Sequence, residues 1–492
     1  MNTKPQKQQQ NKKKFKSAIN PTRDEDFPEW YQQVIKAADM AENAPVRGCM
    51  IIKPFGFAIW ENMQRIFDGM IKELGVENAY FPLLIPLSYI AQEAEHIDGF
   101  AKECAVVTHH RLEEDGEGGL KPAGELAEPY IIRPTSETII GESFSRWINS
   151  YRDLPMKLNQ WCNVMRWEMR PRIFLRTSEF LWQEGHNAFA TAEEANADAR
   201  LMIDKYREFA EDYLAIPMVV GEKTADERFP GAVATYTMEA IMQDGKALQA
   251  GTSHDLGQTF STAADITFQD SYGQNKRAWT TSWGISTRLI GGLIMSHADD
   301  DGLVMPPKVA PQQVVILPIV KGDDNDALFD FCRDIERQLK AKGIRVKFDD
   351  SDSKSADKMW KTIKQGVPVR IEIGGREMDE GKLTFVPRDL GRDGKETREV
   401  ADFVGDIENI LSRIQQSIFD RAYERMVGQI RETDDINVVY DTFKAGEAMQ
   451  VLMPSKLLDD PKYAEIQKEF SVTSRCLPFK YKDEKVLVGK AY

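Results

Sequence analysis

The spacing of apolar residues divides the chain into helical and extended stretches. In 57–74, Ile59, Met63, Ile66 and Met70 recur every three or four residues, which predicts an amphipathic helix. Further helices are predicted at 26–41, 191–214, 407–427 and 431–444. The stretch 109–128 is rich in Gly and Glu without either periodicity, so we interpret it as a loop.

The segment 158–189 has the pattern of a β-hairpin with arms at 158–168 and 179–188. Alternate side chains of a strand share a face. One face therefore groups Val164, Arg166 and Glu168 on the first arm, and Trp182, Glu184 and His186 on the second. The tip, 169–177, has three arginines and no acid, which suits closure over a polyanion. A solvated hairpin with scattered charges is the alternative, and the pattern does not decide which of the two glutamates faces a ligand.

Two turns place polar residues where a strand gives way to another element. The strand at 129–133 breaks at a proline into a polar turn and a helix, where Thr135 or Ser136 is suited to be the N-cap. Either cap leaves Glu137 to point into a pocket. Strands are also predicted at 234–241 and 246–253, and the second leads through Gly251 to His254. Small neighbours let a ligand approach the backbone there, although a lone histidine is more often structural.

The stretch 278–295 is predicted to be a strand, a glycine turn and an apolar helix capped by Ser282 or Ser286. Arg288 then lies in the first turns among apolar residues, where a buried arginine requires an anion. Gly291 and Gly292 each cost the helix about 1 kcal/mol relative to alanine, which predicts a flat group or another backbone packed against them.

From residue 308 the pattern changes to alternating strands and helices. Strands at 314–320, 344–348 and 369–373, with helices at 324–342 and 355–366, predict a compact α/β domain. Four lysines recur at helical spacing, followed by an arginine: Lys354, Lys358, Lys361, Lys364 and Arg370. This basic face is either a solvated helix surface or an RNA footprint.

Composition narrows the class of protein. The 492 residues are 42% hydrophobic with a net charge of −14, which allows several domains and argues against non-specific coating of nucleic acid. No apolar run is long enough to predict a membrane helix. Residues 1–20, rich in lysine and glutamine, are predicted to be a disordered basic tail. The five cysteines show no paired spacing, which favours a reduced, cytoplasmic protein without a thiolate zinc site.

Five segments, in this order, together resemble the class II aminoacyl-tRNA synthetases and, within them, the prolyl-tRNA synthetases. Residues 81–86 (FPLLIP) resemble motif 1, residues 164–186 motif 2 and residues 284–288 (GISTR) motif 3. Residues 133–138 (RPTSET) and 251–254 (GTSH) are similar to the amino-acid pocket of the prolyl enzymes. Each piece is weak alone, but the set is specific and covers nearly the whole chain past the tail.

The resemblance implies an α+β multidomain fold. We expect a class II antiparallel-sheet catalytic domain at 21–306, an α/β anticodon-binding domain at 307–405 and a small α/β C-terminal module at 406–492. It also implies a homodimer through motif 1, although the pattern at 75–86 taken alone favours an ordinary helix–strand unit of the core. The form implied is the archaeal and eukaryotic-like one without an editing insertion, because about ninety residues separate Phe189 from Ala278 and predicted strands occupy them. Relatives often hold zinc in the last module, but this one keeps only Cys476, so we predict no zinc.

The implied reaction joins L-proline to tRNA(Pro) through a prolyl-adenylate made from ATP with Mg²⁺. The residues implied to bind proline are Thr135, Glu137, Arg166, Glu168, Trp182, His186 and His254. Those implied to bind ATP are Arg166, Arg176, Thr177, Gln249, Thr252, Ser286 and Arg288, with Arg166 and Arg288 as the catalytic pair. The residues implied to meet tRNA are Lys354, Lys358, Lys361, Arg370 and Glu372. Relatives more often carry threonine in place of Ser286, but the hydroxyl is kept.

Two other functions remain to be weighed. A catalytically inactive RNA-binding relative should have damaged motifs, whereas Arg166, Glu168 and Arg288 are all present. A synthetase for another amino acid, such as threonine, should show zinc-ligand residues in its pocket. Because a proline pocket cannot strongly reject a ligand that merely lacks methylenes, misactivation of alanine is expected, without editing in the same chain.

Overall fold

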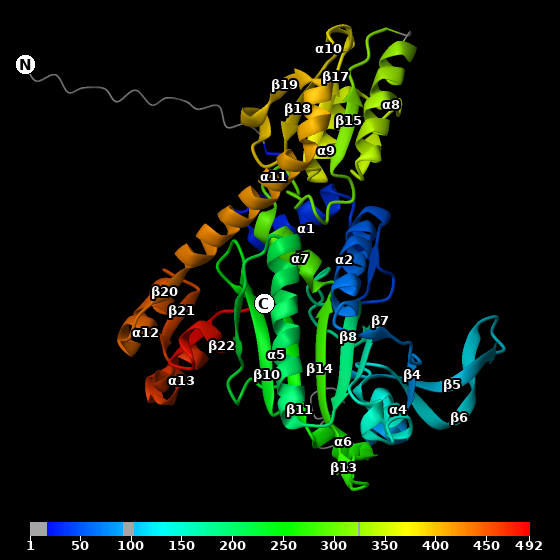
Figure 1. Cartoon of the computed structure of the whole chain (residues 1–492), viewed down its shortest axis with the longest axis vertical. Helices are drawn as coiled ribbons and strands as arrows, with labels where there is room; N and C mark the ends of the chain where they lie inside the picture. The colour runs from blue at the N-terminus through cyan, green and yellow to red at the C-terminus, as the bar shows by residue number, and fades with distance from the viewer. Residues whose placement is uncertain (1–16, 92–102, 323–324) are drawn as a thin grey trace, which may run out of the picture.

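The computed structural model describes residues 17–91, 103–322 and 325–492. Figure 1 shows a catalytic body built on a long sheet, an α/β domain above it and a C-terminal module at its side. None of the helices in these ranges is long and apolar enough to cross a membrane. The predicted tail falls mostly outside the described residues, but its last part is ordered: Ile19 is buried and its N–H donates to Asp300 O at 2.8 Å.

The body is organised on one eleven-stranded sheet. In spatial order its strands are β20 (Ile430–Glu432), β21 (Gln450–Pro454), β23 (Lys485–Gly489), β22 (Thr473–Pro478), β9 (Val219–Glu222), β10 (Ala234–Ile241), β11 (Ala247–Gly257), β14 (Trp279–Ser286), β8 (Glu179–Phe189), β7 (Met156–Met165) and β3 (Glu77–Asn78). The pairs from β21 to β7 are antiparallel, as the class II resemblance predicted.

Helices cover one face of this sheet; the opposite face, on which α4 (Glu137–Trp147) packs beside Ala188, we call the open face. The covering helices are α1 (Phe27–Ala37), α2 (Pro54–Lys72), α5 (Ala192–Glu208) and α7 (Arg288–His297). A capping box between Thr191 and Glu194 begins α5, whose buried side faces the main core. Phe67 of α2 stacks on Tyr206 of α5, and the Tyr206 hydroxyl donates to Gln183 Oε1 at 2.6 Å. Because side chains alternate along β8, the neighbours of Gln183 face the opposite, open side.

The predicted hairpin is β7 and β8, but its first arm ends at Met165 rather than at residue 168. Arg166 and Glu168 therefore lie in the connection between the strands. The centre of the tip is apolar and anchored: residues 173–175 are buried, and Tyr31 Oη donates to Ile173 O at 2.8 Å. Leu175 and the hydroxyl of the aromatic Tyr31 pack against Gly291 of α7, so side chains rather than another backbone occupy the space that this glycine leaves.

The predicted loop at 109–128 is instead a β-ribbon. β5 (Ala105–Glu114) and β6 (Leu120–Ile132) pair antiparallel, and β4 (Leu84–Pro86) adds a third strand. The ribbon projects from the body in Figure 1, so most of its side chains face water and its sequence lacks a buried stripe. Shorter elements nearby are β1 (Ala41–Asn43), β2 (Met50–Ile52), α3 (Leu87–Ala91), α4 (Glu137–Trp147), α6 (Thr259–Ala263), β12 (Thr267–Gln269) and β13 (Asn275–Arg277).

The α/β domain has the predicted alternation and two further strands. Its elements are β15 (Val314–Pro318), α8 (Asp326–Ala341), β16 (Val346–Phe348), α9 (Ser355–Lys364), β17 (Val369–Ile373), α10 (Gly375–Asp379), β18 (Lys382–Pro387) and β19 (Glu396–Glu399). The sheet order is β16-β15-β17-β18-β19, parallel in its first three strands and antiparallel after them.

A single helix, α11 (Val400–Gln429), crosses the boundary predicted at 405/406. Its first half packs in the α/β domain through Phe403, Ile407 and Ile414, and in Figure 1 it continues diagonally to the C-terminal module. That module adds α12 (Ile436–Ala445) and α13 (Pro461–Phe470). It is not a separate sheet: β22 pairs with β9, with Leu477 opposite Glu222, so the last strands extend the catalytic sheet.

Candidate active site

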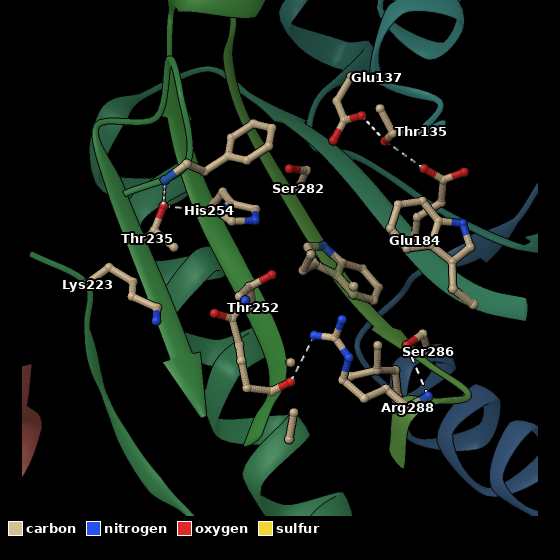
Figure 2. Close-up of a pocket in the computed structure, with 18 of the residues that line it drawn as sticks. Thr135, Glu137, Glu184, Lys223, Thr235, Thr252, His254, Ser282, Ser286 and Arg288 are labelled. Atoms are coloured by element: carbon tan, nitrogen blue, oxygen red, sulfur yellow. Dashed lines mark hydrogen bonds between the residues drawn. The ribbon is translucent and has the colours of Figure 1, made fainter. Parts of the chain in front are cut away.

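A cavity of about 340 Å³ lies on the open face of the catalytic sheet (Figure 2). The strand register brings its lining together in rows across β8, β14, β11 and β10. One row is His186, Ser282, His254 and Thr235, and the next is Glu184, Gly284 and Thr252. Side chains far apart in the sequence thus become neighbours because the pleat points every second residue of each strand to the same face.

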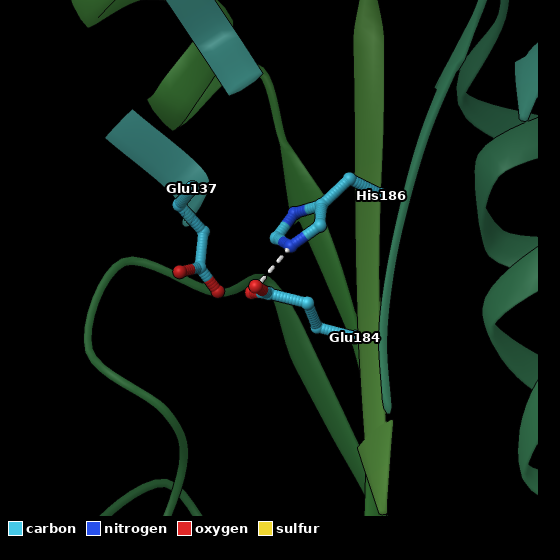
Figure 3. Close-up of side chains that lie close together, drawn as sticks. All are labelled: Glu137, Glu184 and His186. Carbon is cyan, nitrogen blue, oxygen red and sulfur yellow. Dashed lines mark hydrogen bonds and ion pairs between the residues drawn. The ribbon is translucent and has the colours of Figure 1, made fainter. Parts of the chain in front are cut away.

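One end of the cavity is acidic. Glu137, in the first turn of α4, faces Glu184 and His186 of β8 (Figure 3), and ligand atoms of the three lie within 4.8 Å of one another. In the residues that the structure describes, this is the one group with the spacing of a metal site. Thr135 Oγ1 donates to the Glu137 carboxylate. This acidic cluster has no thiolate, and two of its members already form an ion pair of 3.0 Å between His186 Nε2 and Glu184 Oε2.

Glu184 is the most heavily bonded group of the acidic cluster. It accepts from Ser136 N at 3.1 Å, from Ser136 Oγ at 2.5 Å and from Gln160 Nε2 at 3.1 Å. These bonds fix the turn that begins α4, where the N-cap is Ser136 and not Thr135. Ser136 caps without a side-chain bond to the helix because its hydroxyl is committed to Glu184. The turn, and with it Glu137, is therefore held against β8.

The same contacts set the protonation of the acidic end. Burial raises the pKa of Glu184, but the His186 hydrogen bond and charge, with Ser136 and Gln160, outweigh it and bring the pKa to about 2. Burial lowers the pKa of His186, but the hydrogen bond to Glu184 and the nearby carboxylates raise it above its ordinary value. By contrast, burial and then the His186 charge lower the pKa of His254 to about 3. At neutral pH the site therefore holds ionised Glu184 and neutral His254.

The other end of the cavity is basic. Arg288, the first residue of α7, donates from Nε to Leu175 O at 3.1 Å and from Nη1 to Gln249 O at 3.4 Å. Its backbone N–H donates to Ser286 Oγ at 3.2 Å, but the N-cap of α7 is Thr287 and not the predicted Ser282 or Ser286. Burial, followed by the charges of Arg176 and Arg166, lowers the pKa of Arg288 to about 10. These cations so close together provide a site for an anion.

Arg166 connects the two ends. Its Nε donates to Pro134 O at 2.9 Å, and its guanidinium lies 5.8 Å from the Phe180 ring centroid and 5.3 Å from that of Trp182. Burial lowers its pKa, against the attraction of Glu137 and Glu184. Arg166 therefore reaches from the turn before Glu137 to Trp182 of β8, and it lines the same cavity as Arg288.

The structure brings together most of the predicted substrate residues. The cavity is lined by Thr135, Glu137, Arg166, Trp182, His186, Gln249, Thr252, His254, Ser286 and Arg288. Three predicted residues lie outside this lining. Glu168 pairs with the half-exposed Arg176 at 3.0 Å, because β7 has already ended before it. Thr177 is buried and donates to Glu179 O at 2.7 Å.

The cavity also has lining residues outside the predicted set of substrate-binding residues. The main ones are Phe180, Glu184, Lys223, Phe229 and Ser282. Glu184 shared its predicted face with Trp182 and His186, so alternation was a sufficient signal for it. Lys223 carried no such signal, because it reaches the cavity only through the pairing of β9 with β10.

The predicted basic face of α9 is only partly exposed. Lys354 and Lys361 face solvent, but Lys358 is 6% exposed and donates to Asp349 O at 2.9 Å. Arg370 is likewise buried, and it pairs with Glu372 at 2.9 Å. The helical spacing that grouped these lysines does not show which side of the helix packs on the sheet.

Comparisons with known proteins agree with this arrangement. A family model of the tRNA synthetase class II core domain (G, H, P, S and T) matches residues 121–297, and an anticodon binding domain model matches residues 313–410. The chain is 54% identical over 469 residues to a proline–tRNA ligase of Bdellovibrio bacteriovorus, covering 94% of each chain. It is 50% identical over 480 residues to that of Rhodopirellula baltica, covering 94% of this chain and 93% of the relative.

A solved structure shows the same fold. The prolyl-tRNA synthetase of Cryptosporidium parvum, crystallised with halofuginone and AMPPNP, superposes with a TM-score of 0.88 at 36% identity. The match covers 96% of this chain and 99% of that one. The sequence expectation of a class II catalytic domain followed by an anticodon-binding domain is thereby confirmed. The chain belongs to the prolyl-tRNA synthetases (proline–tRNA ligases), a family of class II aminoacyl-tRNA synthetases.

Proposed function

We propose that this cavity binds L-proline at its acidic end and ATP at its basic end, and that the chain makes prolyl-adenylate and transfers the prolyl group to tRNA(Pro). The observation that carries the proposal is the position of Arg166. It is a half-buried guanidinium that donates to Pro134 O beside Glu137 and lines the same cavity as Glu184 and Arg288. The positively charged ammonium group of an amino acid matches the carboxylates, and the negatively charged phosphates of a nucleotide match the cations.

In the first step, an oxygen of the proline carboxylate attacks the α-phosphorus of ATP and pyrophosphate leaves. Arg166 is proposed to donate to both the carboxylate and the α-phosphate, which needs the fixed fork of a guanidinium. In the second step, a ribose hydroxyl at the tRNA 3′ end attacks the prolyl carbonyl and AMP leaves. Both steps depend on positioning and on charge stabilisation, so no covalent enzyme intermediate is required.

Proline recognition is assigned to the acidic end. The secondary ammonium of proline has two N–H donors, which Glu137 and Thr135 are placed to accept. Glu184 holds their turn, and His186 balances its charge. Neutral His254 and Trp182 are proposed to line the pyrrolidine ring. Because the acidic cluster has no thiolate and only one histidine, an ammonium ligand fits it better than the zinc expected in a threonine-type pocket.

The nucleotide is assigned to the basic end. Arg288 is proposed to hold the γ-phosphate end, with Gln249, Thr252 and Ser286 along the wall. Arg176 and Thr177, which lie outside the cavity lining, are proposed to contact the nucleotide from the tip. Mg²⁺ is proposed to arrive with ATP. The hydroxyl and amide oxygens of this wall suit Mg²⁺, because Mg²⁺ binds oxygen ligands. Substrate phosphates and water usually supply most of its coordination shell.

Contact with tRNA is proposed for the α/β domain through exposed Lys354 and Lys361. The buried Lys358 and the Arg370–Glu372 pair stabilise the domain instead. The form without an editing insertion is supported by β9, β10 and β11, which occupy the sequence between the hairpin and motif 3. A cytoplasmic protein without a zinc site in its last module is supported by five free thiols, of which only the buried Cys476 lies there.

A homodimer through the motif 1 region is also proposed. Tyr80 is 75% exposed, and Leu84 and Leu87 next to it are exposed apolar residues beside β4. Apolar side chains gathered next to an edge strand are typical of a buried interface.

Charging of a tRNA(Pro) transcript with radiolabelled proline tests the proposed reaction. The wild-type chain should charge the transcript in the presence of MgATP, and a tRNA(Thr) transcript with threonine should remain uncharged. Arg166→Lys should lower kcat/KM for proline by about 100-fold or more, because two charge-assisted hydrogen bonds are each worth roughly 1.5–3 kcal/mol. A Lys variant within threefold of the wild type would contradict the bridging role.

A further inference from the structure

A buried ion triad joins the C-terminal module to the wall of the cavity. Glu239 of β10 is fully buried and accepts from Lys223 Nζ at 3.1 Å through Oε1. Its other oxygen, Oε2, accepts from Arg475 Nη2 at 2.9 Å and Nε at 3.2 Å. Arg475 belongs to β22, which pairs with β9 beside Lys223. The triad therefore depends on the continuity of the sheet from the catalytic body into the last module.

The triad carries an uncompensated positive charge. Two cations meet one carboxylate, and Lys223 and Arg475 are only 3% and 7% exposed. Placing charges in a protein interior is costly unless they are paired. Arg475 neutralises Glu239 with a two-nitrogen contact and also donates to Thr473 Oγ1 at 2.9 Å. The surplus charge consequently falls on Lys223, which is the member that lines the cavity.

Lys223 has donors to spare. A lysine ammonium has three N–H groups. Among the described residues, its one hydrogen-bonded side-chain partner is Glu239. Its backbone N–H donates to Thr235 O at 2.8 Å, which fixes the start of the side chain at the cavity edge seen in Figure 2. Glu239 is the cross-strand partner of Gln249, so the lysine is directed toward the nucleotide wall rather than the acidic end.

We propose that Lys223 is a further nucleotide-binding residue, whose ammonium donates to an oxygen of bound ATP while Glu239 holds it in place. The oxygen is either a phosphate oxygen or a ribose hydroxyl. The inference rests on the proposed placement of ATP along Gln249 and Thr252. The C-terminal module stabilises the same triad, because Arg475 pairs with the second carboxylate oxygen of Glu239.

The charges of the triad provide a matched pair of variants. Lys223→Met leaves a balanced Glu239–Arg475 pair, and Arg475→Met leaves a balanced Lys223–Glu239 pair. Both remove one positive charge and both keep the remaining ions paired, so both chains are expected to fold. Only Lys223→Met removes the donor at the cavity wall. Thermal unfolding and far-UV circular dichroism of both variants check the fold.

Proline-dependent ATP–pyrophosphate exchange tests the proposal. We expect Lys223→Met to raise KM for ATP about tenfold, with KM for proline changed less than twofold, and Arg475→Met to raise KM for ATP less than threefold. Equal effects of the two variants on ATP, or a parallel rise in KM for proline, would overturn it. Failure of the proposed function itself gives a different result, because the wild-type chain would then show no proline-dependent exchange.

Two further measurements complete the test. If Lys223→Met does not fold, Lys223→Gln keeps a donor toward Glu239 and should raise KM for ATP about three- to fivefold; no change would overturn the proposal. Deoxy-ATP separates the two oxygens. A Lys223→Met penalty that persists with 2′-deoxy- and 3′-deoxy-ATP supports a phosphate contact, and one that disappears with either supports a ribose contact.

Discussion

Substitution of Glu184 by glutamine isolates the charge at the acidic end of the cavity. The pKa of Glu184 falls from its ordinary 4.5 to about 2. At 1.36 kcal/mol per pKa unit, the folded site stabilises the ionised carboxylate by roughly 3 kcal/mol. This contribution is present above pH 4.5 and is lost as the pH falls toward 2, because the folded-state pKa is the lower one. Because glutamine cannot ionise, the variant lacks this whole contribution to stability at pH 7.5.

The amide also disturbs the local bonding. Both carboxylate oxygens of Glu184 accept hydrogen bonds from Ser136, and one of them accepts from Gln160 as well. A glutamine NH₂ must therefore face a donor whichever way it turns. We expect Glu184→Gln to lower the free energy of unfolding by up to about 3 kcal/mol. KM for proline should rise roughly 30- to 150-fold, which corresponds to the loss of about 2–3 kcal/mol of charged hydrogen bonding.

Glu168→Gln is the matched control, because it makes the same change on the same hairpin. Its partner Arg176 has a side chain 56% exposed, and such surface pairs contribute about 0–1 kcal/mol. Proline-dependent ATP–pyrophosphate exchange, with enzyme concentration set by active-site titration, should show KM for proline within threefold of the wild type. A larger rise for Glu168→Gln than for Glu184→Gln would refute the assignment of the acidic end and place the ligand at the first arm.

Three further outcomes are expected. Arg288→Lys should lower kcat/KM for ATP at least 100-fold in the exchange assay, while proline binding followed by calorimetry stays within threefold; a parallel loss of proline binding would indicate a folding defect. The pKa of His254, lowered to about 3 by burial and then by a nearby histidine charge, makes folding less favourable as pH falls below 6.5. His254→Gln should therefore reduce the loss of unfolding free energy between pH 7 and pH 4.5 by roughly 2–3 kcal/mol in denaturant titrations, and an unchanged loss would contradict a neutral imidazole in the folded site. Lys361→Glu should raise KM for tRNA about tenfold without changing proline activation, whereas Lys468→Glu on the last module should change neither; equal loss in both steps would exclude an anticodon-side role.

The alternation of side chains along the strands was enough to predict part of the site. Because strand side chains alternate, Trp182, Glu184 and His186 were grouped on one face, and all three line the cavity. Alternation cannot show where a strand ends. The first arm was extended to Glu168, which lies beyond β7 and pairs with Arg176 instead.

Other features depend on pairing between distant segments. Lys223 reaches the cavity through sheet register and through Arg475, which lies about 250 residues away in the sequence, so no local pattern marks it. The β5–β6 ribbon was interpreted as a loop because both its faces meet water, with Leu112 and Leu120 more than 60% exposed. The boundary placed at 405/406 lies inside α11, whose apolar spacing continues without interruption from one domain to the next.

Exchange of pyrophosphate into ATP, measured for each of the twenty amino acids, tests the central claim most directly. Proline should give the highest kcat/KM. Alanine should give a detectable rate lower by roughly one to three orders of magnitude, because each missing methylene weakens binding by only about 1–3 kcal/mol. Exchange that depends on threonine or another amino acid more strongly than on proline, or no exchange with proline at all, would contradict the assignment of the cavity.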